Sequence, residues 1–272
     1  VYPHPVGPVP RGIRALPLPL QGRVVSMELV EPKVKPPLDP NFRPAALAVR
    51  RFREKVAESG RGVPLRIALE REKGLVTVYE TEVFGDGAPE FDENYQYVER
   101  LVKTLLWARG GWRVVVGGPR AVGEFIQKTY SPDGQQAFDY EFMGDVYEKP
   151  FSVEITDPDS VPEAREQAVA IGRHLDGCRI GFDAGASDHK VAAVVDGEAV
   201  FTNEVVWDPK SQSNPMYHYH HVQSALHLAA AHMPRVDAIG VSAAGIYIDN
   251  RARVASLFRG IPKDQFEAHI AD

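Results

Sequence analysis

The segment Gly181–Lys190 contains the residue types that a phosphate-binding turn needs. Gly185 lets the backbone fold tightly and leaves amide groups available to phosphate oxygens. Ser187 supplies a hydroxyl group and Lys190 a positive charge, while Asp183 could hold a magnesium ion through water, because hard cations prefer oxygen ligands. These residues predict a phosphate and magnesium site, and an ordinary β-hairpin with polar turn residues is the alternative interpretation.

The elements around this turn decide whether its residues can act together. Alternating apolar residues and turn signals predict three short strands, then a helix and a fourth strand. The predicted ranges are Arg179–Asp183, Lys190–Asp196, Glu198–Trp207, Tyr217–His232 and Val236–Val241. The order β-β-β-α-β is typical of an α/β fold with a mixed sheet, and the turn joins its first two strands. A hairpin-like extension follows, formed by 247–250 and 253–257.

The spacing D-x-G-x-[ST]-x-x-[KR] is matched by Asp183, Gly185, Ser187 and Lys190. It resembles the first phosphate motif of hexokinase-like sugar kinases and of the ROK (repressor, open reading frame, kinase) family, within the actin-like ATPase superfamily. The resemblance implies that residues 176–272 form the first lobe of such a fold, with a ribonuclease-H-like βββαβ arrangement. It also implies that these four residues bind ATP phosphates and Mg²⁺.

A second segment is similar to the ROK sequence that lines the sugar pocket, in which a strand ends in G-x-x-x-P-G before a downstream Asp. Here Gly245 and Asp249 are the candidate sugar-binding residues. The match departs from the family pattern because Ala244 replaces the proline and one extra residue separates Gly245 from Asp249.

The resemblance implies a cytoplasmic ATP-dependent sugar kinase whose partners are a nucleotide and a small sugar, and it leaves a homo-oligomer open. In that family the catalytic base lies in an Asn-Asp segment that opens the second lobe, and we find no counterpart in these 272 residues. We therefore expect an incomplete lobe that binds magnesium nucleotide without phosphorylating sugar. The alternative is a non-catalytic sugar or nucleotide sensor that uses the same fold.

Four other features could carry chemistry, but each has a simpler interpretation. Gly240–Gly245 reads G-x-S-x-x-G, one residue longer than the nucleophile elbow of serine hydrolases. His218 and His221 could share a helix face, yet no acid or cysteine completes a metal site. Gly117-Gly118 favours a tight connection over an anion site, and Cys178 a small buried side chain.

The preceding residues predict a second α/β region whose role the sequence does not show. Helical periodicity and strand alternation indicate elements at about 45–59, 64–70, 75–83, 94–109, 112–116 and 120–130. In the longest helix the predicted buried stripe comprises Val98, Leu101, Val102 and Leu105. The domain boundaries that we predict are a proline-rich, disordered or upstream extension at 1–26, a small α/β domain at 27–155 and a linker at 156–175.

Composition narrows the classes of partner. The formal net charge of −6 gives no reason to expect nucleic-acid binding, which normally needs a basic face. The longest run of low polarity, Ala238–Ile248, is too short to span a bilayer. A single cysteine excludes an internal disulfide and fits a reducing cytoplasm.

Overall fold

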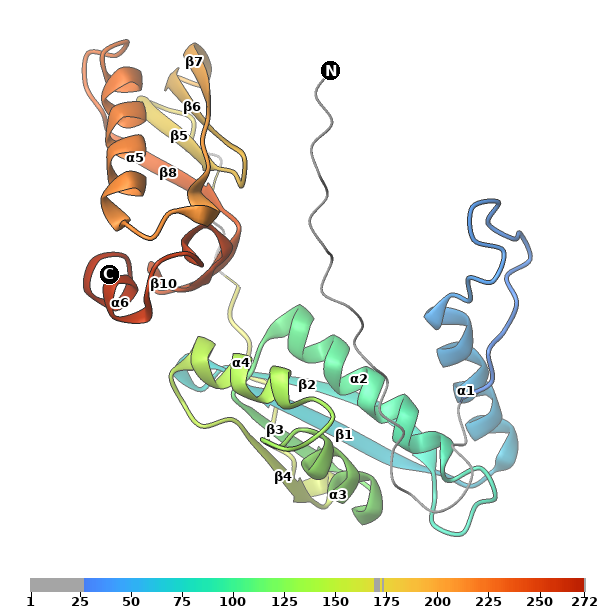
Figure 1. Ribbon diagram of the computed structural model, residues 1–272. Coiled ribbons are helices and arrows are strands. Elements are labelled where there is room, and N and C mark those ends of the chain that lie inside the picture. Colours follow the sequence, from blue (N-terminus) through green and yellow to red (C-terminus); the bar gives the residue numbers. More distant parts are fainter. Residues whose placement is uncertain (1–26, 169–171, 173, 272) are drawn as a thin grey trace. The chain divides into compact units, whose positions relative to one another are not determined.

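The computed structural model describes residues 27–168, 172 and 174–271, and it divides into two compact units (Figure 1). Among these residues, the first unit comprises 27–144 and 149–166, and the second comprises 145–148 and the residues from 167 onward. Both units combine helices with mixed sheets, so the predicted α/β class is confirmed. The prediction for residues 1–26 lies outside the described residues.

In the first unit, the described residues form a four-stranded sheet with the order β2-β1-β3-β4. Strand β1 pairs antiparallel with β2 and β3, and β3 pairs parallel with β4. The strands are β1 (Gly62–Glu70), β2 (Val76–Phe84), β3 (Arg113–Gly117) and β4 (Ser152–Thr156). The helices are α1 (Ala45–Ser59), α2 (Glu93–Arg109), α3 (Arg120–Thr129) and α4 (Ala137–Tyr147), and the last three residues of α4 belong to the second unit. Two short 3₁₀ turns are η1 (Glu72–Gly74) and η2 (Pro158–Ser160).

The elements predicted up to residue 130 are present within one or two residues of their expected ends, whereas α4 and β4 were missed. The sequence of α4 distributes its aromatic and acidic residues around the helix, so it shows no amphipathic stripe. The buried face of α2 is also turned slightly from the predicted one. Val98 and Val102 are fully buried as expected, but Tyr97 and Leu106 complete the face, and Leu101 and Leu105 are only partly buried.

Helices pack against the strands of this sheet, and an extended segment covers part of its other face. Residues 157–166, which we predicted as the first part of a linker, pack on the first unit instead. Val161 is buried in a cluster with Ala68, Val76 and Val115, and Arg165 exchanges two backbone hydrogen bonds with Val76. The segment packs there because the apolar side chains of Ala68 and Val115 would otherwise be exposed on this part of the sheet.

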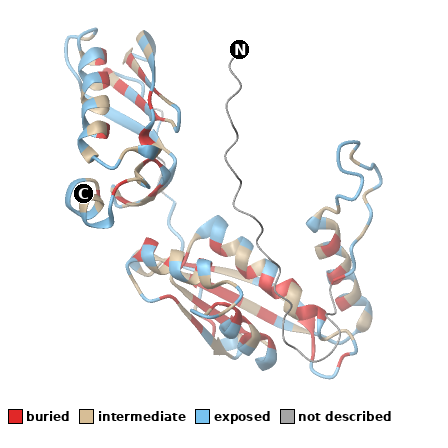
Figure 2. Ribbon diagram, viewed as in Figure 1, coloured by how far each residue is buried: buried red, intermediate tan, exposed pale blue. Residues whose placement is uncertain are grey.

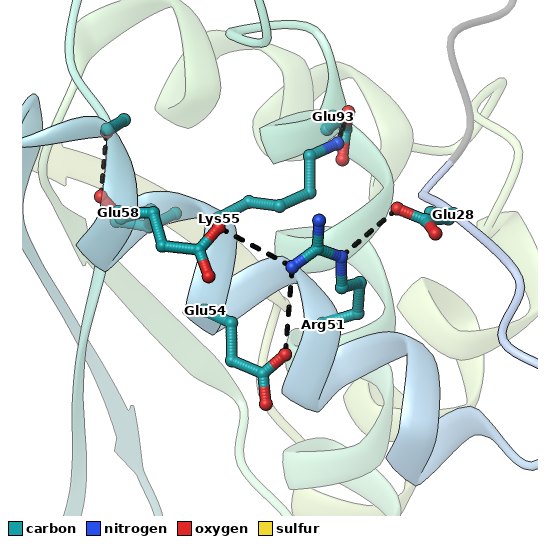
Figure 3. Close-up of polar contacts among 8 residues, drawn as sticks. Glu28, Arg51, Glu54, Lys55, Glu58 and Glu93 are labelled. Atoms are coloured by element: carbon teal, nitrogen blue, oxygen red, sulfur yellow. Dashed lines mark hydrogen bonds and ion pairs between the residues drawn. The ribbon is translucent and has the colours of Figure 1, made fainter.

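Helix α1 joins this unit through an aromatic core and a set of ion pairs. The Phe52 ring stacks on Tyr97 at 4.1 Å between centroids and meets Phe84 edge-on at 5.5 Å. On the outer side, Lys55 pairs with Glu93, and the Arg51 guanidinium is surrounded by acidic side chains (Figure 3). These acids are Glu28 at 3.3 Å, Glu58 at 3.5 Å and Glu54 at 3.8 Å.

In the second unit, the described residues form a four-stranded sheet with the order β7-β6-β5-β8. The strands are β5 (Cys178–Ala184), β6 (Asp188–Val195), β7 (Glu198–Val206) and β8 (Ala238–Ala243). Strand β6 is antiparallel to β5 and β7, while β8 is parallel to β5 and follows helix α5 (Pro215–Ala230). This is the predicted βββαβ arrangement.

The rest of this unit consists of short elements. A two-stranded sheet is formed by β9 (Gly245–Ile248) and β10 (Arg251–Ala255), and helix α6 (Lys263–His269) follows. The 3₁₀ turn η3 (Pro209–Ser211) precedes α5, and the 3₁₀ turn η4 (Ser256–Phe258) follows β10. The predicted hairpin extension is therefore present two residues earlier than expected.

Helix α5 covers one face of the sheet of the second unit. Ile180, Phe182, Val191 and Ala193 are buried in one core with Ala225 and Ala229 of the helix. Because side chains alternate along a strand, the residues between them point to the other face. That face is open, as the pale blue stretches of the strands in Figure 2 show.

Candidate functional site

The open face of the second sheet brings the two charged residues of the predicted phosphate motif together. Asp183 on β5 is the register partner of Lys190 on β6, which in turn is paired with Glu204 on β7. On the other side, Asp183 is paired with Ser242 on β8. All four residues are exposed, so they form one polar row across the sheet.

This polar row borders a hollow of about 670 Å³ on the open face. Two glycines, Gly181 and Gly240, are register partners in its floor. Each has open space where a side chain would lie. A floor without side chains lets a ligand approach the sheet backbone closely. The sequence analysis did not assign Thr202, Glu204 or Gly240 to this site, because their common position depends on strand register.

The predicted glycine and serine lie in the turn that joins β5 to β6, directly beside this row. A side chain at Gly185 would have its Cβ 2.5 Å from the Asp188 carbonyl oxygen, so the turn needs glycine. Trp207 donates two hydrogen bonds to this turn. Its indole Nε1 donates to the Gly185 carbonyl at 2.9 Å, and its backbone N–H donates to the Ser187 carbonyl at 3.1 Å. These two hydrogen bonds tie the turn to the residue that follows β7.

Asp188 is the residue of this site that the motif did not reveal. Its carboxylate accepts a hydrogen bond from Ser187 Oγ at 3.0 Å and pairs with the Lys190 ammonium. The hydrogen bond from Lys190 and that from Ser187 lower the pKa of Asp188, and the same contact raises the pKa of Lys190. Both groups therefore stay charged. The sequence signal that could have placed Asp188 beside Lys190 is that every second side chain along β6 points to the same face.

A histidine pair lies under the turn, on the side of α5. His189 Nε2 and His221 Nδ1 are 3.1 Å apart, and His189 is buried against the Trp207 ring. Burial and the nearby His221 lower the pKa of His189, and burial and the nearby His218 lower that of His221. Both rings are therefore neutral at physiological pH.

The two candidate sugar-binding residues have local structural roles. Gly245 begins β9, and a Cβ there would lie 2.8 Å from both the Ala255 Cβ and the Val254 carbonyl oxygen. Asp249 and Asn250 form the tight β9–β10 turn, each with a positive φ. Strands β5 and β8 are parallel and end in register, so Gly185 and Gly245 lie just beyond the same end of the sheet. Asp249 lies at the opposite end of the β9–β10 hairpin from Gly245.

The remaining sequence candidates have structural explanations. Ser242 lies within β8 and not on the sharp turn of a nucleophile elbow. His218 bonds to the Pro209 and Leu257 carbonyls, and no group of three potential ligands that could hold a metal ion occurs among the described residues. Gly117 approaches Val161 too closely for a side chain, and Cys178 is buried.

No protein-family model matches this chain, and no curated protein matches it. Among solved structures, it is similar to the crystal structure of an exopolyphosphatase from Cytophaga hutchinsonii, with 10% sequence identity and a TM-score of 0.19. The alignment covers 66% of this chain and 64% of that protein, so this chain spans less than two thirds of its length. A likeness at this score carries no argument about function. The resemblance to ROK kinases therefore depends on the motif residues and the βββαβ order.

Within the part of the chain that the structure describes, no helix has both the length and the apolar character that a bilayer crossing requires.

Proposed function

We propose that the second unit binds the phosphate groups of a magnesium nucleotide on the open face of its sheet, as the phosphate-binding part of an ATP-dependent sugar kinase. The observation that carries this proposal is that Asp183 and Lys190 are exposed and paired in register on neighbouring strands. The turn between these strands requires glycine at position 185. Strand pairing thereby places a carboxylate and an ammonium group on the same edge as the Ser187 hydroxyl.

Each residue has a chemical task in this proposal. Lys190 and Ser187 donate hydrogen bonds to phosphate oxygens, since charge-assisted bonds to phosphate are the stronger kind. The Asp183 carboxylate fits a magnesium ion, because Mg²⁺ in such sites is bound through one or two carboxylates, several waters and the substrate phosphates. Bound magnesium would offset phosphate charge, and the glycine floor would admit the ligand without a steric barrier.

A second candidate is the alternative named above, a non-catalytic sugar or nucleotide sensor, and the local roles of two residues support its nucleotide form. Gly245 and Asp249, the residues that the family resemblance assigns to the sugar, serve the packing and the turn of the β9–β10 hairpin. If these roles exclude sugar contact, the phosphate site would remain and the sugar site would be missing. The two candidate functions share the nucleotide and differ in turnover.

The test of nucleotide binding is an NMR titration of the full chain with Mg-ATP. We expect shifts in the β5–β6 turn and a millimolar dissociation constant, worth about 4 kcal/mol, because the open hollow leaves phosphate contacts to water. Lys190→Ala should weaken binding, whereas Arg235→Ala, which removes an exposed cation that does not line the hollow, should not. Equal affinity in all three chains would contradict the proposal.

A coupled ADP-release assay across hexoses and N-acetyl sugars separates the two candidates. Turnover that disappears in Lys190→Ala would favour the kinase and would require a catalytic carboxylate within this chain. Nucleotide binding without turnover would favour the sensor, since losing a base alone slows such reactions by about 100- to 10,000-fold.

A further inference from the structure

The two phosphate-binding donors of the proposed site already share an anionic partner within the protein. Asp188 and Lys190 are two residues apart on β6, so their side chains leave the strand on the same open face. One oxygen of the Asp188 carboxylate accepts from Ser187 and the other from Lys190. A phosphate group offers the same donors a similar pair of negatively charged oxygens.

The turn keeps this carboxylate in place. The Asp188 carbonyl lies against Gly185, at 2.5 Å from where a Cβ would be, and Trp207 bonds to the carbonyls of Gly185 and Ser187. The backbone from 185 to 188 is therefore held at several points. Rotation of side chains, of Asp188 or of the exposed Ser187 and Lys190, is therefore the simplest way to separate the carboxylate from its donors.

Other acids near Lys190 do not hold it in the same way. Glu204 is 3.7 Å from the Lys190 ammonium and its side chain is 60% exposed. Asp183 lies across the strand pair and acts on Lys190 through its charge. Of these acids, Asp188 alone also accepts from Ser187 in the part of the chain that the structure describes.

From this geometry we infer that Asp188 is an internal competitor for phosphate, which sets the affinity of the site by occupying Ser187 and Lys190. The inference rests on the proposed function, because it concerns the same two donors. A phosphate ligand binds by displacing the Asp188 carboxylate, and the repulsion between that carboxylate and the phosphate charge is lowest when magnesium accompanies the ligand. Asp188 therefore favours magnesium-bound phosphate over free phosphate.

The experiment measures the binding of two probes, inorganic tripolyphosphate without metal and Mg-ATP, to the full chain by NMR titration. Asp188→Asn keeps the shape of the side chain and removes its charge. We expect roughly three- to tenfold tighter binding of tripolyphosphate, since an exposed ion pair and one like-charge contact are removed, and a smaller gain for Mg-ATP. Asp188→Ser should give the same direction, and melting curves establish that each variant folds.

Glu198→Gln is the matched control, because it removes an exposed carboxylate from the neighbouring strand β7 that does not line the hollow. Its effect should be less than about twofold, since exposed and distant pairs contribute little. The gain from Asp188→Asn should also become smaller in a Lys190→Ala background, where Asp188 has no ammonium to withhold and occupies only Ser187.

The outcomes separate this inference from the proposed function. If the wild-type chain binds Mg-ATP and Asp188→Asn binds both probes no more tightly, the inference is overturned and the proposed function stands. If Asp188→Asn binds more weakly, the inference is also overturned, and Asp188 is a ligand contact. If neither chain binds either probe, both the inference and the proposed function fail.

Discussion

The two units of this protein differ in how far the faces of their sheets are covered. In β1 of the first unit, Ile67, Ala68 and Leu69 are buried in succession, because helices cover one face and residues 157–166 cover part of the other. In β5 of the second unit, burial alternates, with Phe182 buried and Asp183 exposed. A sheet with an open face can present polar groups in register, as the second unit does along Asp183, Lys190 and Glu204.

The largest effects expected from this comparison come from aspartate substitutions at neighbouring strand positions. In the second unit, Ala193→Asp places a charge in the core under α5 and should cost more than about 4 kcal/mol. Ala192→Asp faces the open side and should cost about 1 kcal/mol or less, mainly through lower strand propensity. Chemical denaturation of the soluble variants measures the difference.

The same pair of substitutions in the first unit is the control. Ala68 and Leu69 are neighbours on opposite faces, and both are almost completely buried. We expect Ala68→Asp and Leu69→Asp to be equally damaging and to prevent soluble expression. A folded Ala68→Asp variant would show that residues 157–166 do not cover this part of the second face, and a misfolded Ala192→Asp variant would contradict the open face.

An intermediate effect is expected from acid, and only in the second unit. The pKa values of His189 and His221 are depressed below the ordinary 6.5, by burial and by their histidine neighbours, while the nearby Asp188 opposes the shift for His189. A histidine whose pKa is lowered by folding stabilises the fold at pH values above its pKa in the unfolded chain. This contribution is lost as the pH falls below about 6.5. Residues 27–168 contain no histidine, so the first unit should not respond in this range.

The Trp207 ring contacts His189 at 5.0 Å between centroids, so its indole NMR signal reports on this part of the second unit. The measurement is the melting temperature that this signal gives at each pH from 8 to 5. We expect its melting temperature to fall with pH, and the fall to shrink in His221→Gln. His220→Gln removes an exposed histidine from the same helix and should leave the pH dependence unchanged. A parallel fall in signals of the first unit would contradict the assignment to this histidine pair.

The smallest effect is expected at the surface of the first unit. Arg51→Ala removes ion pairs with Glu28, Glu54 and Glu58, all of them on exposed side chains. Exposed ion pairs add little stability and are screened by salt, so the melting temperature should change by very little, and not at all in about 1 M salt. A clear loss that persists in high salt would mean that Arg51 packs α1 onto the unit through its aliphatic part.

Local patterns were sufficient for most of the elements. The boundaries of α1, the alternation in β5 to β7 and the turn at Gly185 follow from neighbouring residues, because caps, strand periodicity and tight turns depend on short-range sterics. Helix α4 was missed because its apolar residues surround the axis, and the actual face of α2 was displaced because Tyr97 packs on Phe52 from another helix.

The candidate site divides in the same way. The sequence by itself determined that Asp183, Gly185, Ser187 and Lys190 lie around one strand–turn–strand unit, since their spacing and the glycine leave few other conformations. Only the tertiary structure decided that Ser242 and Glu204 extend this row, that residues 157–166 cover part of the other sheet, and that Asp188 occupies the donors. These facts depend on strand register and on contacts between distant segments, which are set by what each face must bury and not by adjacent residues.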